Sequence, residues 1–113
     1  MPSSTDIRDV SGWSVLSVAG DLDIYAAPRL RGELVDLIAA GTHRLVVDTG
    51  GVTFIDSTGL GVLIGALKRV RAADGELRVV ASGEPVVRML RVTGLHRVFS
   101  TFATLDEAVA DRG

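Results

Sequence analysis

The stretch FIDSTGLGVLIGALKRV, residues 54–70, joins the end of an apolar run to the start of a helix. From Leu60 onward, apolar residues recur with the spacing of one helix face, at positions 60, 63, 64, 67 and 70, and the pattern ends near residues 73–75. Gly59 and Gly61 each cost the first turn about 1 kcal/mol relative to alanine. A helix cap returns only about that much in total. We therefore interpret this helix start as a contact site, where uncovered backbone lets another molecule approach closely.

Strand and helix patterns alternate on both sides of this motif. Apolar and β-branched runs predict strands at residues 7–10, 13–19, 44–48, 76–81 and 98–102. A hairpin turn at Ser11-Gly12 is expected between the first two. Besides the central helix, the sequence predicts a helix from near Pro28 to Gly41, one over residues 82–94, and one after the T-x-x-E capping box of Thr104 and Glu107.

Helices between consecutive strands favour parallel pairing, because each helix returns the chain to the starting edge of the sheet. Strand sequences such as LVV at 45–47 are continuously apolar, as expected for strands covered on at least one face. Right-handed crossovers in sequential strand order place the helices on one side of the sheet. A doubly wound order is the alternative. The prediction is one α/β domain over residues 1–113, with a core at about 7–110, a mostly parallel sheet of about five strands beginning with a hairpin, and four helices mainly on one face.

The composition narrows the classes of function. A chain of 113 residues with 47% hydrophobic residues and a mean hydropathy of +0.35 fits one folded domain. The net charge is −2 and the basic residues are scattered, which does not indicate a nucleic-acid surface. The chain has no cysteine, which excludes disulfides, thiol nucleophiles and zinc-thiolate sites. We find no signal-peptide core and no apolar run of membrane length, so we expect a cytoplasmic protein that does not enter a membrane.

Polar residues follow three of the predicted strands. They are Asp21 and Asp23 after the second strand, Asp56, Ser57 and Thr58 after the third, and Ser82-Gly83 after the fourth. The loops that follow parallel strands meet at one edge of the sheet, where α/β proteins usually have their sites. Asp56 or Ser57 is expected to cap the central helix, with its side chain at the surface.

These residues do not predict a catalytic site. A nucleophile elbow needs G-x-S-x-G, but Ile55 stands two positions before Ser57. His43 and His96 begin elements that we place at the opposite edge of the sheet, so neither is a suitable general base. Lys68 is the only lysine and lies within the helix, and no G-x-x-x-x-G-K-[ST] loop is present to hold a phosphate.

The three aspartates allow one further interpretation, because Asp21, Asp23 and Asp56 carry oxygen ligands suited to a hard cation. Such a site needs a denser set of ligands, and solvated or capping carboxylates explain these residues more simply. The sequence therefore predicts no enzyme activity, no cofactor and no bound metal.

Two blocks of the sequence together resemble a known family. GDLDIYAAPRLRGEL at 20–34, followed by DTGGVTFIDSTGLGVLIGALKRV at 48–70, is similar to the STAS domain, and specifically to the stand-alone anti-sigma factor antagonists of bacteria. The similarity runs from about Ile7 to Ala110 and includes the late stretch TGLHRVFSTFATLDEAV. It implies a one-sided β-α arrangement, which supports the sequential strand order.

The resemblance implies a switch between partners that is built on Ser57. In the family, the serine directly after the motif aspartate is phosphorylated by a partner that is both a serine kinase and an anti-sigma factor. By position this residue is Ser57, while Thr58 takes the second hydroxyl position. The unphosphorylated form would bind the anti-sigma factor and so release a sigma factor. Phosphorylation would end the binding, and a phosphatase would restore it.

Partner contacts are expected around this serine. The match to the acidic loop implies that Asp21 and Asp23 lie at the partner surface. The helix face around Val62, Ala66 and Arg69 is expected to supply apolar contact. The other expected contact residues are Asp56, Thr58, Gly59 and Gly61.

The chain departs from the family pattern at two places. Ala26 stands where a threonine or serine often caps the first helix, and Gly50-Gly51 is expected to make the loop before the motif flexible. The alternative function is a soluble STAS subunit of a membrane lipid-transport complex, without a phosphorylation cycle. Direct nucleotide binding by the protein is a third option.

Overall fold

The computed structural model describes residues 3–110, in which strands and helices alternate as the sequence predicts. The strands are β1 (Ser4–Val10), β2 (Trp13–Leu22), β3 (Arg44–Ile55), β4 (Glu76–Val80) and β5 (Ser100–Phe102). The helices are α1 (Ala27–Ala39), α2 (Ser57–Ala72), α3 (Glu84–Val92), the 3-10 turn η1 (Leu95–Arg97) and α4 (Leu105–Val109). The ends of the predicted domain, residues 1–2 and 111–113, lie outside the described part of the chain.

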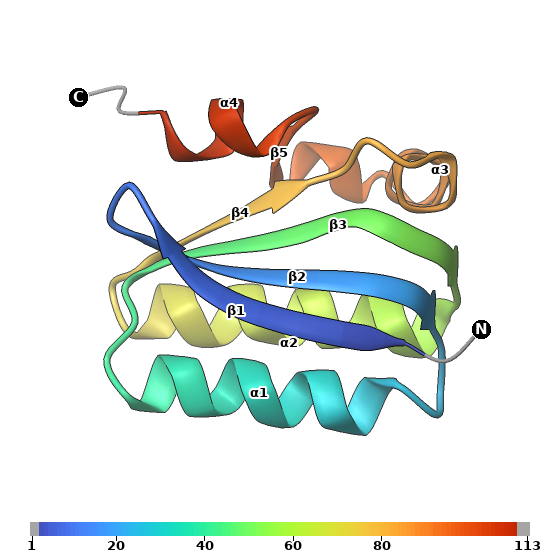
Figure 1. Cartoon of the computed structure of the whole chain (residues 1–113). Helices are drawn as coiled ribbons and strands as arrows, with labels where there is room; N and C mark the ends of the chain where they lie inside the picture. The colour runs from blue at the N-terminus through green and yellow to red at the C-terminus, as the bar shows by residue number, and fades with distance from the viewer. Residues whose placement is uncertain (1–2, 111–113) are drawn as a thin grey trace.

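The five strands form one sheet in the sequential order β1-β2-β3-β4-β5, so the doubly wound alternative is excluded. β1 and β2 pair antiparallel, and every later pair is parallel (Figure 1). The hairpin turns at Ser11 and Gly12, whose φ angles of 53° and 83° are both positive, as a type I′ hairpin turn requires. The predicted fold class, including the hairpin, is confirmed.

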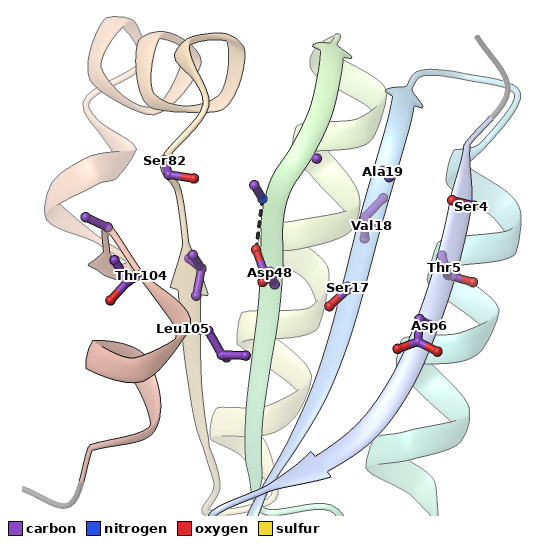
Figure 2. Close-up of a pocket in the computed structure, with 14 residues that line it drawn as sticks. Ser4, Thr5, Asp6, Ser17, Val18, Ala19, Asp48, Ser82, Thr104 and Leu105 are labelled. Carbon is purple, nitrogen blue, oxygen red and sulfur yellow. Dashed lines mark hydrogen bonds between the residues drawn. The ribbon is translucent and has the colours of Figure 1, made fainter.

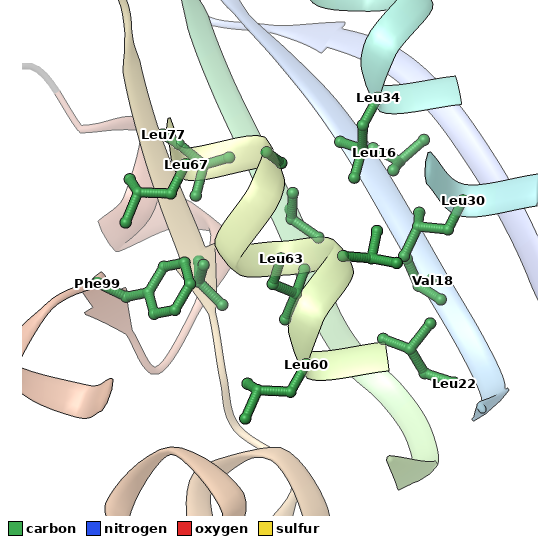
Figure 3. Close-up of a cluster of buried hydrophobic side chains, with 14 of the residues drawn as sticks. Leu16, Val18, Leu22, Leu30, Leu34, Leu60, Leu63, Leu67, Leu77 and Phe99 are labelled. Carbon is green, nitrogen blue, oxygen red and sulfur yellow. The ribbon is translucent and has the colours of Figure 1, made fainter. Parts of the chain in front are cut away.

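Alternating side chains of the central strands separate two cores. Leu16 and Leu77 point to the face on which α1 and α2 lie side by side (Figures 1 and 3), and Leu45 belongs to the same core. Buried residues of α3 belong to this same large core. Residues of the opposite pleat, including Val15 and Val46, pack instead against α4. Three of the four helices thus serve one core, in agreement with the expectation of helices mainly on one face.

A buried arginine on β4 holds α4 against the opposite face of the sheet by a hydrogen bond. Arg78 is 9% exposed, and its Nη1 donates to the carbonyl of Ala108 at 2.8 Å. Its Nε donates to Glu76 at 2.9 Å, and its guanidinium lies 4.3 Å from the centre of the Trp13 ring. Trp13 is 1% exposed and receives a second cation, Arg44, at 4.7 Å. The charge of Arg78 is therefore compensated by a carboxylate, a carbonyl and an aromatic face.

The stretch before the central motif differs from its prediction. β3 continues without interruption to Ile55, and Gly50-Gly51 forms part of the strand, so the expectation of a flexible loop is wrong. The physical reason is close packing with β2, whose pairing register shifts between Ser17 and Ala19. A Cβ on Gly51 would lie 2.9 Å from the Cβ of Ala19, so only glycine lets the two strands approach at this point.

Replacing Arg78 by methionine tests the contribution of its hydrogen bond to α4. We expect Arg78→Met to lower the free energy of unfolding by about 2 kcal/mol, because the buried carbonyl of Ala108 loses its donor. Arg44→Met is the control: Arg44 is exposed and covers the same Trp13 ring, so its loss is expected to cost less than about 1 kcal/mol. Urea unfolding followed by Trp13 fluorescence measures both. Equal losses would contradict this account of Arg78.

Candidate functional site

The carboxylate of Asp56 organises the edge of the sheet at which the central motif lies. Asp56 is the N-cap of α2, and its Oδ1 accepts a hydrogen bond from the backbone N–H of Gly59 at 2.9 Å. Its Oδ2 accepts from the N–H of Ile24, in the loop after β2, at 3.2 Å. One side chain thus caps the helix and connects it to the neighbouring loop. Of the two expected candidates, Asp56 and Ser57, the cap is Asp56.

Ser57 is the first residue of α2 and is exposed. Asp56 provides the cap, and within residues 3–110 the Ser57 hydroxyl makes no hydrogen bond to another residue. The first amides of a helix have no intrahelical acceptor, and the helix dipole makes this end positive. A group with negative charge on Ser57 would therefore meet a favourable backbone and would displace no side chain.

The two remaining aspartates stabilise the loop beside Ser57. Asp23 Oδ1 accepts from the N–H groups of Tyr25 and Ala26, both at 3.0 Å. The Asp23 carboxylate thus orders the turn before α1, whose N-cap Ala26 has no capping side chain, and the N–H of Ala27 donates to the backbone carbonyl of Asp23 at 2.9 Å. Asp21 Oδ1 accepts from the hydroxyl of Thr53 on β3 at 3.2 Å. All three aspartates thus have structural partners besides any role at a surface.

The two motif glycines, Gly59 and Gly61, differ in whether the packing of the fold requires a glycine at that position. Gly59 is buried, and a Cβ there would lie 2.3 Å from the carbonyl oxygen of Leu22, so this glycine is required by the packing of α2 on the end of β2. The interpretation of Gly59 as uncovered backbone for a partner is therefore wrong. Gly61 is exposed, and a Cβ there would meet nothing within 4 Å. Gly61 alone fits the predicted open backbone, and Thr58, next to Ser57, is half-buried.

The helix face expected to supply apolar contact is only partly at the surface. Val62 and Ala66 are each 3% exposed and belong to the large core, where α2 packs against α1. The expectation of an exposed apolar face is wrong for this reason, and the two side chains reach the surface only in the lining of a groove between α1 and α2. Arg69 is exposed, as the prediction requires.

Three exposed apolar side chains surround the motif and were not singled out from the sequence. Ile24 is 59% exposed, Tyr25 is 89% exposed, and Phe54 is 50% exposed. Ile24 is joined to Asp56 through its amide, and Phe54 on β3 pairs with Asp21 on β2. Their signal in the sequence is an apolar pair directly after the acidic loop and an aromatic residue two positions before Asp56. Tyrosine is enriched among the side chains that anchor protein–protein interfaces.

The histidines do not join this site. The carbonyl of His43 accepts from the N–H of Glu76 at the start of β4, so His43 lies at the opposite edge, as predicted. His96 instead lines a cavity of about 260 Å³ with Ala81 and Ala103, which directly follow β4 and β5, so its predicted position is wrong. The short β5 and the turn η1 place His96 alongside the strands. Within residues 3–110, no group of three or more His, Cys, Asp or Glu side chains is arranged to hold a metal ion.

A separate hollow of about 420 Å³ lies beside α4, on the face of the sheet opposite α1 and α2 (Figure 2). Ser17 of β2, Asp48 of β3 and Thr104 before α4 line it. Asp48 already accepts from the N–H of Gly50 at 2.9 Å. Ser57 is not among the lining residues, so this hollow is distinct from the motif.

Alanine substitutions at the two motif glycines separate packing from exposure. Gly59→Ala is expected to lower the free energy of unfolding by about 2 kcal/mol or more, because its Cβ would overlap the carbonyl of Leu22. Gly61→Ala is expected to raise it by about 0.5 to 1 kcal/mol, because alanine favours a helix and the space is open. Thermal unfolding of both variants gives the comparison. Effects of the same sign would show that the two glycines are not distinguished by packing.

Comparisons with known proteins agree with this arrangement. The STAS domain family matches residues 4–108. An anti-sigma-B factor antagonist of Bacillus subtilis is 32% identical over 109 residues, which cover 96% of this chain and 99% of that protein. An anti-sigma-B factor antagonist of Staphylococcus epidermidis is 38% identical over 80 residues, which cover 71% of this chain and 74% of that protein. None of the helices formed by residues 3–110 is long and apolar enough to span a membrane.

A solved structure is similar over nearly the whole chain. The crystal structure of an anti-sigma factor antagonist from Mycobacterium paratuberculosis superposes with a TM-score of 0.88 at 33% identity, covering 96% of this chain and 92% of that one. The sheet order, the capped helix and these similarities lead to one conclusion: the chain belongs to the STAS domain family.

Proposed function

We propose that this protein is an anti-sigma factor antagonist of the bacterial cytoplasm, a regulator and not an enzyme. With Ser57 unmodified, it binds an anti-sigma factor that is also a serine kinase, and a sigma factor is released. Transfer of phosphate from ATP to the Ser57 hydroxyl ends the binding, and a phosphatase removes the phosphate. The names of the relatives that match over most of the chain support the class of partner.

The observation that carries the proposal is the division of roles between Asp56 and Ser57. Asp56 caps α2 and holds the adjacent loop, while Ser57 stands exposed at the positive end of the helix. Phosphate adds a charge of about −1.5 to −2 at neutral pH. At a helix N-terminus this charge is favourable by about 0.3 to 1 kcal/mol, so the fold tolerates it.

The same charge acts strongly at an interface. A partner carboxylate about 6 Å from the phosphate would be repelled by roughly 3 kcal/mol per pair of unit charges at an effective dielectric constant near 20. Half of that value, after screening by salt, corresponds to about a tenfold loss of affinity. The exposed side chains of Ile24, Tyr25 and Phe54 supply apolar contact area at the same place. Phosphorylation therefore changes binding and leaves the fold intact.

Phosphorylation at Ser57 is the first test. Incubation of the protein with a purified GHKL-type anti-sigma factor kinase from the same bacterium and ATP is expected to add one phosphate, located by mass spectrometry at Ser57. Ser57→Ala is expected to abolish the incorporation, while Thr58→Val, a change at the neighbouring hydroxyl, leaves it in place. Incorporation that persists in Ser57→Ala would refute the assignment. Co-purification with a permease and an ATPase, in place of a kinase, would favour the lipid-transport alternative.

A charge mimic separates binding from folding. Ser57→Asp is expected to weaken binding to the anti-sigma factor at least tenfold while the melting temperature changes by less than about 3 °C, because an acid in the first turn suits the helix dipole. Asp56→Ala is the matched variant: it removes the cap and is expected to lower the free energy of unfolding by about 1 to 2 kcal/mol. Calorimetry and thermal unfolding measure the two effects. A large loss of stability in Ser57→Asp would make Ser57 a structural residue.

A further inference from the structure

A groove between α1 and α2 begins one helical turn beyond Ser57. It encloses a cavity of about 120 Å³. Leu34 and Val62, both buried, contribute to its floor, and Val35 is half-buried beside them. Arg31 of α1 and Arg69 of α2 complete the lining, and both are exposed. Each helix thus contributes one cation to an otherwise apolar groove.

Two of the α2 residues that line the groove are glycines, which leave the helix backbone uncovered at their positions. Gly61 and Gly65 both line it, and a Cβ at either position would meet nothing within 4 Å. Because residues four apart lie on one stripe of a helix, Ser57, Gly61 and Gly65 follow one another along the surface of α2. The groove is therefore continuous with the surface around the phosphorylation site.

Neither of the two arginines forms an ion pair with a residue in the range 3–110. Within the described part of the chain, neither side chain makes a hydrogen bond, an ion pair or a ring contact. Other arginines do: Arg29 pairs with Glu33 at 3.3 Å, and Arg78 pairs with Glu76 at 2.9 Å. No acidic residue lines the groove, although the whole chain carries a net charge of −2. By electrostatic complementarity, this unpaired positive charge favours a binding partner with acidic side chains in the groove.

We propose that the groove receives an acidic α-helix of the anti-sigma factor, whose carboxylates face Arg31 and Arg69. The inference rests on the proposed function and specifies the partner's chemistry at that interface. The absence of side chains at Gly61 and Gly65 lets the backbone of the incoming helix approach α2 closely. An acidic helix lying one turn from Ser57 is also the element that a phosphate on Ser57 repels most strongly.

Charge reversal tests the electrostatic part of the proposal. The probe is the purified anti-sigma factor kinase that binds the wild-type protein, immobilised for surface plasmon resonance at two salt concentrations. The double variant Arg31→Glu/Arg69→Glu is expected to bind at least tenfold more weakly, mainly through slower association, and to show less salt dependence. Arg97→Glu, an exposed arginine on η1 outside the groove, is expected to remain within twofold of the wild type.

Filling the groove tests the geometric part. Gly65→Leu is expected to weaken binding at least tenfold while the melting temperature stays equal or rises, because the space is open and leucine favours a helix. Gly32→Leu on α1 is the matched control, since a Cβ there also meets nothing within 4 Å and Gly32 is exposed outside the groove. It is expected to bind like the wild type.

The outcomes separate the two proposals. Wild-type binding with both groove variants within twofold would overturn the groove and leave the proposed function standing. If the wild type binds no anti-sigma factor, the proposed function fails, and a fluorescein-labelled helical peptide of about 20 residues with glutamates along one face becomes the probe. Anisotropy that rises with the wild type and with Arg97→Glu, and not with Arg31→Glu/Arg69→Glu, would keep the groove as an acidic-helix site. Equal response of all three proteins would overturn it.

Discussion

The site depends on one carboxylate that bonds to two backbone amides from different segments. Asp56 accepts from Gly59 within its own helix and from Ile24 across the edge of the sheet, and its own N–H donates to the carbonyl of Leu22 at 3.3 Å. These bonds fix the start of α2 against the end of β2. Because Asp56 caps α2, the neighbouring Ser57 is not needed as the cap.

The order of elements could be predicted because it depends on local patterns. The apolar spacing after Leu60 gives α2, and the hairpin follows from Ser11-Gly12, where the turn needs positive φ angles. What could not be predicted depends on contacts between segments distant in the sequence. Gly50-Gly51 has the composition of a loop, yet close packing against Ala19 makes it part of β3.

The candidate site shows the same limit. Ser57 at the surface follows from its place next to a cap, which is local information. The burial of Val62 and Ala66 depends on where α1 packs against α2, and no spacing within α2 reports the position of a neighbouring helix. For Gly59 the cost in helix propensity suggested a partner, whereas the cause is the carbonyl of Leu22 within the fold. A glycine that costs helix stability shows that something is close, and it does not show whether that is the protein or another molecule.

The residues that stabilise the fold lie apart from Ser57, the residue of the proposed switch. Arg78, Trp13 and α4 close one face of the sheet with a compensated cation, while the packing of α1 and α2 fills the other. Ser57 lies outside both cores, at a helix end whose amides favour negative charge. In the proposed switch, a phosphate on exposed Ser57 would lie at this helix end, on the surface where a docked partner would meet it. Since neither core contains Ser57, the proposed phosphorylation would act on the free energy of partner binding and not on the free energy of folding.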